Sequence, residues 1–204
     1  ARFTTSLLPE YLAAMEFAVP ANDLVDQITG GRRAVERRFD VAGSDLRISR
    51  ISWALLVVDA VLNAERLREC YNRALAAYRK EHRVRTSGRP VPQLEKIDER
   101  IELPFWACRP GEPRRRLFVQ TVNTKWRLFA EQMPMAEVSR NDLFAWAESP
   151  GRVTPFSDWA VRPRALMLTL WARMLFADFF IHGIGGAQYD RMTDGIIRDY
   201  FGVE

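Results

Sequence analysis

The chain has 204 residues, of which 48% are hydrophobic and 27% are charged. That is enough apolar material for one large domain or two small ones, and it excludes a disordered tail, a disulfide-stapled mini-protein and a collagen-like fibre. Thirty basic residues against 26 acidic ones leave a net charge of only +4. All but three of the basic residues are Arg, whose planar guanidinium suits carboxylates and phosphates, although a GC-rich genome also favours Arg codons.

The N-terminal half of the chain has the apolar spacing of helices. A first helix is expected to end at Pro20. Further helices are predicted over residues 21–28, 32–39, 53–62 and 64–82. Gly30-Gly31 is expected to end the second helix, and Asn63 to cap the last one. Residues 46–51 alternate apolar with polar side chains, which is typical of a strand.

A basic connector punctuated by proline, residues 83–92, divides the chain into a helical region, 1–92, and a second region, 93–204. In the second region a hairpin is predicted over 101–108 and 117–120, with a candidate third strand at 125–129. Ser139 is expected to cap a short helix that follows. The sequence therefore predicts an α+β fold, predominantly helical with a small antiparallel sheet.

The final third holds the longest apolar run. Arg162-Pro163-Arg164 is expected to open a hydrophobic helix that reaches about Ile181, with Pro163 at its first position. Because Arg173 and Asp178 interrupt this run, we expect a buried helix of a soluble protein rather than a membrane span. A closing helix is predicted over 189–201, with Gly202 as its stop.

The glycine-rich turn predicted over residues 182–187 is the first candidate ligand site. Gly183, Gly185 and Gly186 allow positive φ, so their N–H groups could line an anion nest ahead of the closing helix. Tyr189 and Asp190 follow as further candidate ligand residues. The spacing matches neither the GxGxxG fingerprint nor a P-loop. The alternative is an ordinary turn between helices, which also needs glycine.

Asp178 and His182 are candidate catalytic residues. They are four apart and hence share one helical face, where the carboxylate could orient the imidazole as a general acid or base. The alternative is a histidine that caps a buried helix. A metal site made of His182, Asp190 and Asp194 would be poorly specific, so no metal is assigned.

Three arginines, Arg162, Arg164 and Arg173, flank or interrupt the apolar helix and are candidate clamps for an anionic ligand. An arginine in a buried stretch needs an acid or a bound anion to offset its desolvation. The alternative is therefore a structural ion pair of Arg173 with Asp178 or Asp158.

A basic run, residues 114–116, stands beside Trp106 and Phe118 and has the composition of a single-stranded nucleic-acid patch. A solvated hairpin loop explains the same residues, and the small net charge argues against nucleic acid as a partner. Cys70 and Cys108 lie far apart without CxxC spacing, which fits a reducing, cytoplasmic setting.

Several of these segments together resemble an uncharacterised bacterial family of longer proteins. The resemblance rests on Arg162-Pro163-Arg164-Ala165-Leu166, on residues 179–190, on Pro104-Phe105-Trp106 and on residues 114–119. That family is in turn distantly similar to the cysteine-adding enzyme of bacillithiol biosynthesis. The resemblance implies a larger α/β, nucleotide-binding-like fold of which this chain keeps a helix-rich part, and it carries no catalytic residue over. The absence of an initial Met also leads us to expect a segment of a longer protein.

Two functions remain as hypotheses. The first is a cytoplasmic segment of an α/β enzyme that binds a small anionic ligand bearing phosphate or carboxylate. The second is a helical interaction or assembly module without catalysis, in which the same polar residues form an internal network.

Overall fold

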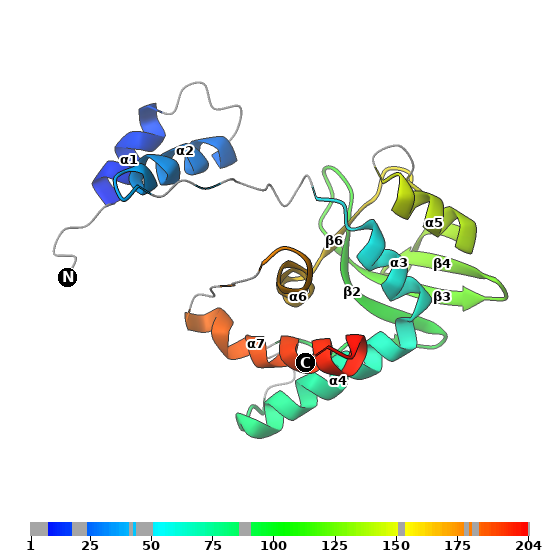
Figure 1. Ribbon diagram of the computed structural model, residues 1–204. Coiled ribbons are helices and arrows are strands. Elements are labelled where there is room, and N and C mark those ends of the chain that lie inside the picture. Colours follow the sequence, from blue (N-terminus) through cyan, green and yellow to red (C-terminus); the bar gives the residue numbers. More distant parts are fainter. Residues whose placement is uncertain are drawn as a thin grey trace. The chain divides into compact units, whose positions relative to one another are not determined.

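The computed structural model describes residues 8–17, 24–40, 43, 51–85, 91–150, 154–177, 180 and 184–203. It divides the chain into two compact units, Ala1–Ile51 and Ser52–Glu204 (Figure 1). The boundary differs from the predicted division after residue 92. Helix α4 (Ala64–Glu81) contacts strand β2 (Arg100–Cys108), so the helices over residues 52–92 belong to the same unit as the sheet.

The first unit contains helices α1 (Leu8–Phe17) and α2 (Leu24–Arg37). Helix α2 runs straight through Gly30-Gly31, so the predicted break at these glycines is wrong. Gly31 is buried against α1, and a Cβ at this position would lie 2.6 Å from the Cγ atom of Met15. The glycine therefore serves close helix packing. The strand predicted over residues 46–51 lies outside the described residues except for Ile51.

The second unit is a mixture of helices and an antiparallel sheet, which agrees with the α+β prediction at that level. Besides α4 and β2, its elements are α3 (Ala54–Leu62), β1 (Lys96–Ile97), β3 (Arg115–Val122), β4 (Lys125–Ala130), β5 (Met133–Ser139), α5 (Arg140–Glu148), β6 (Ala160–Pro163), α6 (Ala165–Leu175), α7 (Ile184–Ile196) and the π-helical turn η2 (Ile197–Phe201). The helices α3 and α4, the hairpin, the third strand and the Ser139 cap are confirmed. Asn63 makes no side-chain cap to α4 and instead bonds back to Asp59.

The sheet has the order β1-β2-β3-β4-β5, and β6 also pairs with β2. Three of its hairpins turn through two residues, and the first residue of each turn has positive φ: Asp98 at 52°, Asn123 at 55° and Glu131 at 57°. Positive φ in such short turns matches the twist of the flanking strands. Asp and Asn tolerate this conformation, whereas Glu is an uncommon choice.

Strand β2 is bulged between Leu103 and Trp106, where its register with β3 shifts. Pro104 occupies the bulge, a position that suits a residue without an N–H group. Its carbonyl accepts a 3.1 Å hydrogen bond from the backbone N–H of Arg164. Beyond the bulge, Trp106 lies opposite Arg162 of β6. The bulge thus links the central strand to the segment that leads into α6.

The two faces of the sheet differ in chemistry. Leu103, Leu117 and Ala130 lie opposite one another on β2, β3 and β4, and all three are fully buried. The other face places Glu102, Phe118 and Phe129 opposite one another, with Arg100 and Arg116 two residues away on the same side. We call these last five residues the arginine–aromatic face.

The C-terminal helices depart from the predicted pattern. Residues 162 and 163 belong to β6, and α6 ends at Leu175 instead of continuing to Ile181, so the single long helix is wrong. Proline at 163 is accommodated because β6 is a short edge strand. Helix α7 packs on α4, where the Cβ of Ala74 would lie 3.1 Å from a Cβ at Gly195. Gly202, with φ of 71°, ends the last helical turn as predicted.

Within the described residues, none of the helices has both the length and the apolar character required to cross a membrane.

Candidate functional site

The predicted glycine nest is only partly described. Asp178, His182 and Gly183 lie outside the described residues. Gly185 and Gly186 lie in the first turn of α7, which begins at Ile184, so the turn expected over these two residues is wrong. Tyr189 and Asp190 lie further along the same helix, and the ring of Tyr189 is 6.1 Å from that of Tyr78 on α4.

Arg173 and Asp190 lie next to each other, but they form an ion pair with each other instead of lining a ligand site together. One guanidinium nitrogen lies 2.7 Å from Asp190, and the other lies 2.6 Å from Asp194. Burial lowers the pKa of Arg173, but the hydrogen bond to Asp194 and the charge of Asp190 outweigh it, and the net pKa is raised. The expected partners were Asp178 and Asp158, and Asp158 instead pairs with Arg109. A partly buried polar cluster of this kind is what the assembly-module hypothesis expects.

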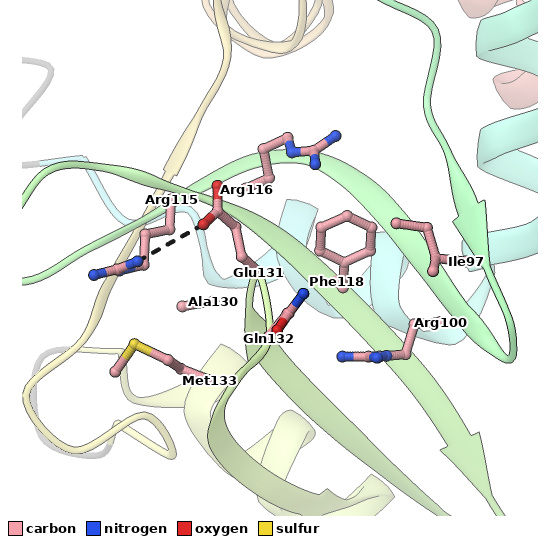
Figure 2. Close-up of a pocket in the computed structure, with 9 residues that line it drawn as sticks. All are labelled: Ile97, Arg100, Arg115, Arg116, Phe118, Ala130, Glu131, Gln132 and Met133. Atoms are coloured by element: carbon pink, nitrogen blue, oxygen red, sulfur yellow. Dashed lines mark ion pairs between the residues drawn. The ribbon is translucent and has the colours of Figure 1, made fainter.

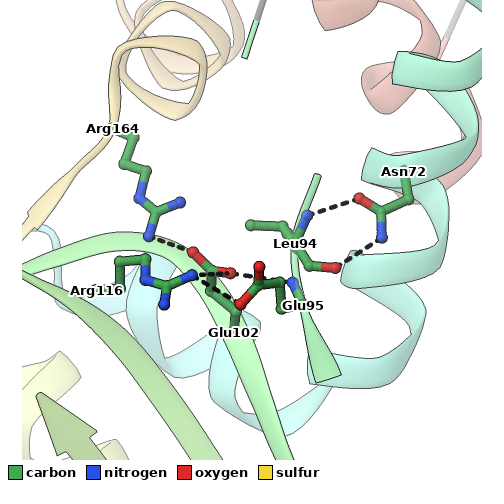
Figure 3. A network of polar contacts seen from close by, with 6 residues as sticks. All are labelled: Asn72, Leu94, Glu95, Glu102, Arg116 and Arg164. Atoms are coloured by element: carbon green, nitrogen blue, oxygen red, sulfur yellow. Dashed lines mark hydrogen bonds and ion pairs between the residues drawn. The ribbon is translucent and has the colours of Figure 1, made fainter. Parts of the chain in front are cut away.

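Arg164 is also committed to an acid (Figure 3). Its guanidinium donates a 2.7 Å hydrogen bond to the carboxylate of Glu102, and it stacks 4.4 Å from the ring centroid of Trp106. Arg114 stacks on the same indole at 4.6 Å. The indole of Trp106 is therefore engaged within the protein by two guanidinium groups. Arg162 is half-buried on β6, opposite Trp106.

Glu102 is the centre of a network that extends to α4 (Figure 3). Its carboxylate lies 3.5 Å from Arg116 and accepts a 3.0 Å hydrogen bond from the backbone N–H of Glu95. The carboxylate of Glu95 also pairs with Arg116, at 2.8 Å. Next to Glu95, the backbone N–H and C=O of Leu94 both bond to the side-chain amide of Asn72, at 2.8 and 2.9 Å. The network fixes the position of Arg116 on the sheet.

A cavity of about 430 Å³ opens beside this network, and we call it the arginine pocket (Figure 2). It is lined by Ile97, Arg100, Arg115, Arg116, Phe118, Ala130, Glu131, Gln132 and Met133. Its size is that of a site for a small molecule. Three of the nine lining residues are arginines and one is an acid, so cationic groups dominate its polar wall.

The three arginines of the pocket differ in how they are neutralised. Arg115 lies 3.5 Å from Glu112 and 3.7 Å from Glu131, and Arg116 is held by Glu95 and Glu102. Burial lowers the pKa of Arg116, but its hydrogen bond to Glu95 and the nearby carboxylates leave that pKa raised. The guanidinium of Arg100 lies 5.2 Å from the ring centroid of Phe129. In the part of the chain that the structure describes, it has no carboxylate partner.

The turn at Glu131 and Gln132 forms one border of the pocket. Glu131 has φ of 57°, a conformation that costs a residue other than glycine roughly 1–2 kcal/mol. Its backbone N–H donates a 2.8 Å hydrogen bond to the carbonyl of Arg116, which fixes the turn on β3. The side chains of Glu131 and Gln132 are thereby held at the pocket border (Figure 2).

Sequence reasoning identifies Arg115 and Arg116 as a basic run beside Phe118, but it does not identify Arg100 or the apolar residues Ile97 and Met133 as part of the same site. Arg100 comes to these arginines through the pairing of β2 with β3, which a linear spacing does not show. The alternation of polar and apolar side chains over residues 100–103 is the one sequence pattern that points to this site, because it places Arg100 and Glu102 on one face of a strand.

No protein-family model, curated protein or solved structure matches the chain. The resemblance to the bacterial family and to the cysteine-adding enzyme stays a prediction.

Proposed function

We propose that this chain binds a small anionic ligand, bearing a phosphate or a carboxylate, in the arginine pocket. The ligand class is the one predicted from the sequence, but the site is on the sheet instead of at the glycine segment. The observation that supports the proposal is Arg100, a pocket arginine without a carboxylate partner among the described residues.

The neighbouring arginines strengthen this site without being its main donors. Arg115 and Arg116 are already positioned by acids, so their side chains lose little further freedom when a ligand enters. Both side chains line the same cavity as Arg100. A fixed, partly shielded guanidinium forms a stronger pair with an anion than one in bulk water.

The candidate clamps Arg164 and Arg173 do not support this role, because each already bonds to an acid of the chain. No catalytic step is proposed, since the acid–base pair Asp178 and His182 lies outside the described residues.

Isothermal titration of the protein with inorganic phosphate, and separately with acetate, tests the proposal. We expect binding in the millimolar range or tighter, and a loss of about tenfold or more in Arg100→Gln, because a charge-assisted hydrogen bond contributes roughly 1.5–3 kcal/mol. The glutamine variant keeps a polar side chain at the half-buried first residue of β2 and is expected to fold.

Arg191→Gln is the matched control. Arg191 lies on α7, pairs with Glu81 and does not line the arginine pocket, so the same loss of charge there is expected to leave binding unchanged. Equal weakening in both variants would indicate a general charge effect and would contradict a site at Arg100. Absence of binding of both anions to the unaltered protein would also refute the proposal.

A further inference from the structure

We infer that the ligand of the arginine pocket carries its anionic group on an apolar body, as an aryl or alkyl phosphate monoester or a hydrophobic carboxylate does. This inference rests on the proposed function and adds the second half of the ligand. It follows from the placement of exposed apolar side chains beside Arg100.

The first observation is the cross-strand pair formed by Ile97 and Arg100. The two residues lie directly opposite each other on β1 and β2, so their side chains stand on the same face of the sheet. Ile97 is 43% exposed although it is a large aliphatic residue. An anion bound at Arg100 would therefore lie against hydrocarbon.

The second observation is the apolar part of the opposite wall. Met133, at the start of β5, is 37% exposed and lines the same cavity. Phe118 contributes to the pocket between Arg116 and Arg100 in the view of Figure 2. Methionine adapts its shape readily and is common where a surface receives apolar groups of varied form. A ligand that covers Ile97 and Met133 removes both from water.

The third observation is the balance of charge in the cavity. Glu131 lines the pocket and partners Arg115, while Glu95 holds Arg116. A second anionic group would have to displace one of these carboxylates. Arg100 requires no such displacement. The pocket therefore fits one anionic group near Arg100, and the rest of the cavity, whose total volume is about 430 Å³, is available to an uncharged body.

Three probes separate the two halves of the ligand: inorganic phosphate, phenol and phenyl phosphate. Because burial of a phenyl ring against apolar side chains is favourable, phenyl phosphate is expected to bind at least about tenfold more tightly than inorganic phosphate. Phenol is expected to bind more weakly than phenyl phosphate by a similar factor. Benzoate in place of phenyl phosphate distinguishes a carboxylate from a phosphate as the preferred head group.

Two variants test whether Ile97 and Met133 contact the apolar part of the ligand. Ile97→Ser and Met133→Ser are each expected to weaken phenyl phosphate about threefold or more while leaving inorganic phosphate unchanged, whereas Arg100→Gln weakens both. Leu55→Ser is the control, because Leu55 is 68% exposed on α3 and does not line the pocket. Circular dichroism on each variant verifies that the fold is kept.

The outcomes separate this inference from the proposed function. Equal affinity for phenyl phosphate and inorganic phosphate, with both lost in Arg100→Gln, would overturn the apolar body and leave the anion site intact. If Ile97→Ser and Met133→Ser bind phenyl phosphate as tightly as the unaltered protein does, the apolar body is overturned as well. Failure of every anionic probe to bind would refute the proposed function itself.

Discussion

The guanidinium of Arg164 and the carboxylate of Glu102 form a buried ion pair with an N–O distance of 2.7 Å, in which the two side chains are 11% and 1% exposed. The pair joins the segment before α6 to the central strand β2. Its position, on the strand that pairs with three others, makes it a structural centre of the second unit.

Replacing Glu102 with Leu is expected to destabilise the protein by about 3–5 kcal/mol, because Arg164 would remain as a buried cation without its acid. Arg164→Met is expected to cost less, because Glu102 keeps Arg116 at 3.5 Å and the hydrogen bond from the backbone N–H of Glu95. The double variant is expected to lose much less stability than the sum of the two single losses, since neither buried charge is then left without its partner. Urea unfolding of the four proteins measures the coupling, and additive losses would contradict the pairing.

Arg173→Met is expected to lower stability by roughly 1 kcal/mol, since its pairs with Asp190 and Asp194 are partly exposed. Because this cluster is separate from the lining of the arginine pocket, phosphate binding is expected to be unchanged. Thermal unfolding and isothermal titration on the same preparation give the two readouts. Loss of phosphate binding at unaltered stability would instead favour the ligand clamp predicted from the sequence.

Glu131→Asn is expected to raise stability by roughly 0.5–1 kcal/mol, because asparagine tolerates the left-handed conformation that Glu131 adopts. The reciprocal change, Asn123→Glu, places glutamate at a turn position of nearly the same φ and is expected to cost a similar amount. Chemical denaturation of both variants checks the sign. A destabilised Glu131→Asn protein would show that the contact of Glu131 with Arg115 outweighs the backbone conformation.

The capping box at α5 predicts a dependence of stability on acid pH. Hydrogen bonds from the side chain and the backbone N–H of Ser139 lower the pKa of Asp142 below its usual 3.8. A lowered folded-state pKa stabilises the protein above the unfolded value and loses that contribution as the pH falls through the folded value. Asp142→Asn is therefore expected to flatten the decline of the unfolding midpoint below about pH 4. Parallel pH profiles for the two proteins would contradict this assignment.

Elements whose signals are local could be predicted from the sequence. The stripe of α4 and the Ser139 cap depend on residues within one or two turns, and both are confirmed. The edge strand β5 was missed because its Met-Pro-Met-Ala start lacks alternation. The sequence predicts a break at Gly30-Gly31 because glycine has a low helix propensity. In the structure Gly31 allows α2 to pack closely on α1, and local propensity does not encode such a contact.

The candidate site was harder to predict because its contacts are distant in sequence. Arg173 finds its acids 17 and 21 residues further along the chain, beyond the neighbours that a helical face would suggest. Arg164 reaches Glu102 across 62 residues, and Arg100 joins Arg116 through strand register. Composition indicated an anion-binding chemistry, but the selection among 27 arginines depends on pairings that only the folded chain makes.

The two hydrogen bonds between the side chain of Asn72 and the backbone of Leu94 have a consequence for how the sheet is attached to the helices. An amide side chain that offers a donor and an acceptor imitates a neighbouring strand, and here a helix supplies it. The chain entering β1 is thereby tied to α4 across 22 residues of sequence. Removal of the Asn72 amide would leave the backbone N–H and C=O of buried Leu94 without these partners, and is therefore expected to loosen the start of β1 from α4.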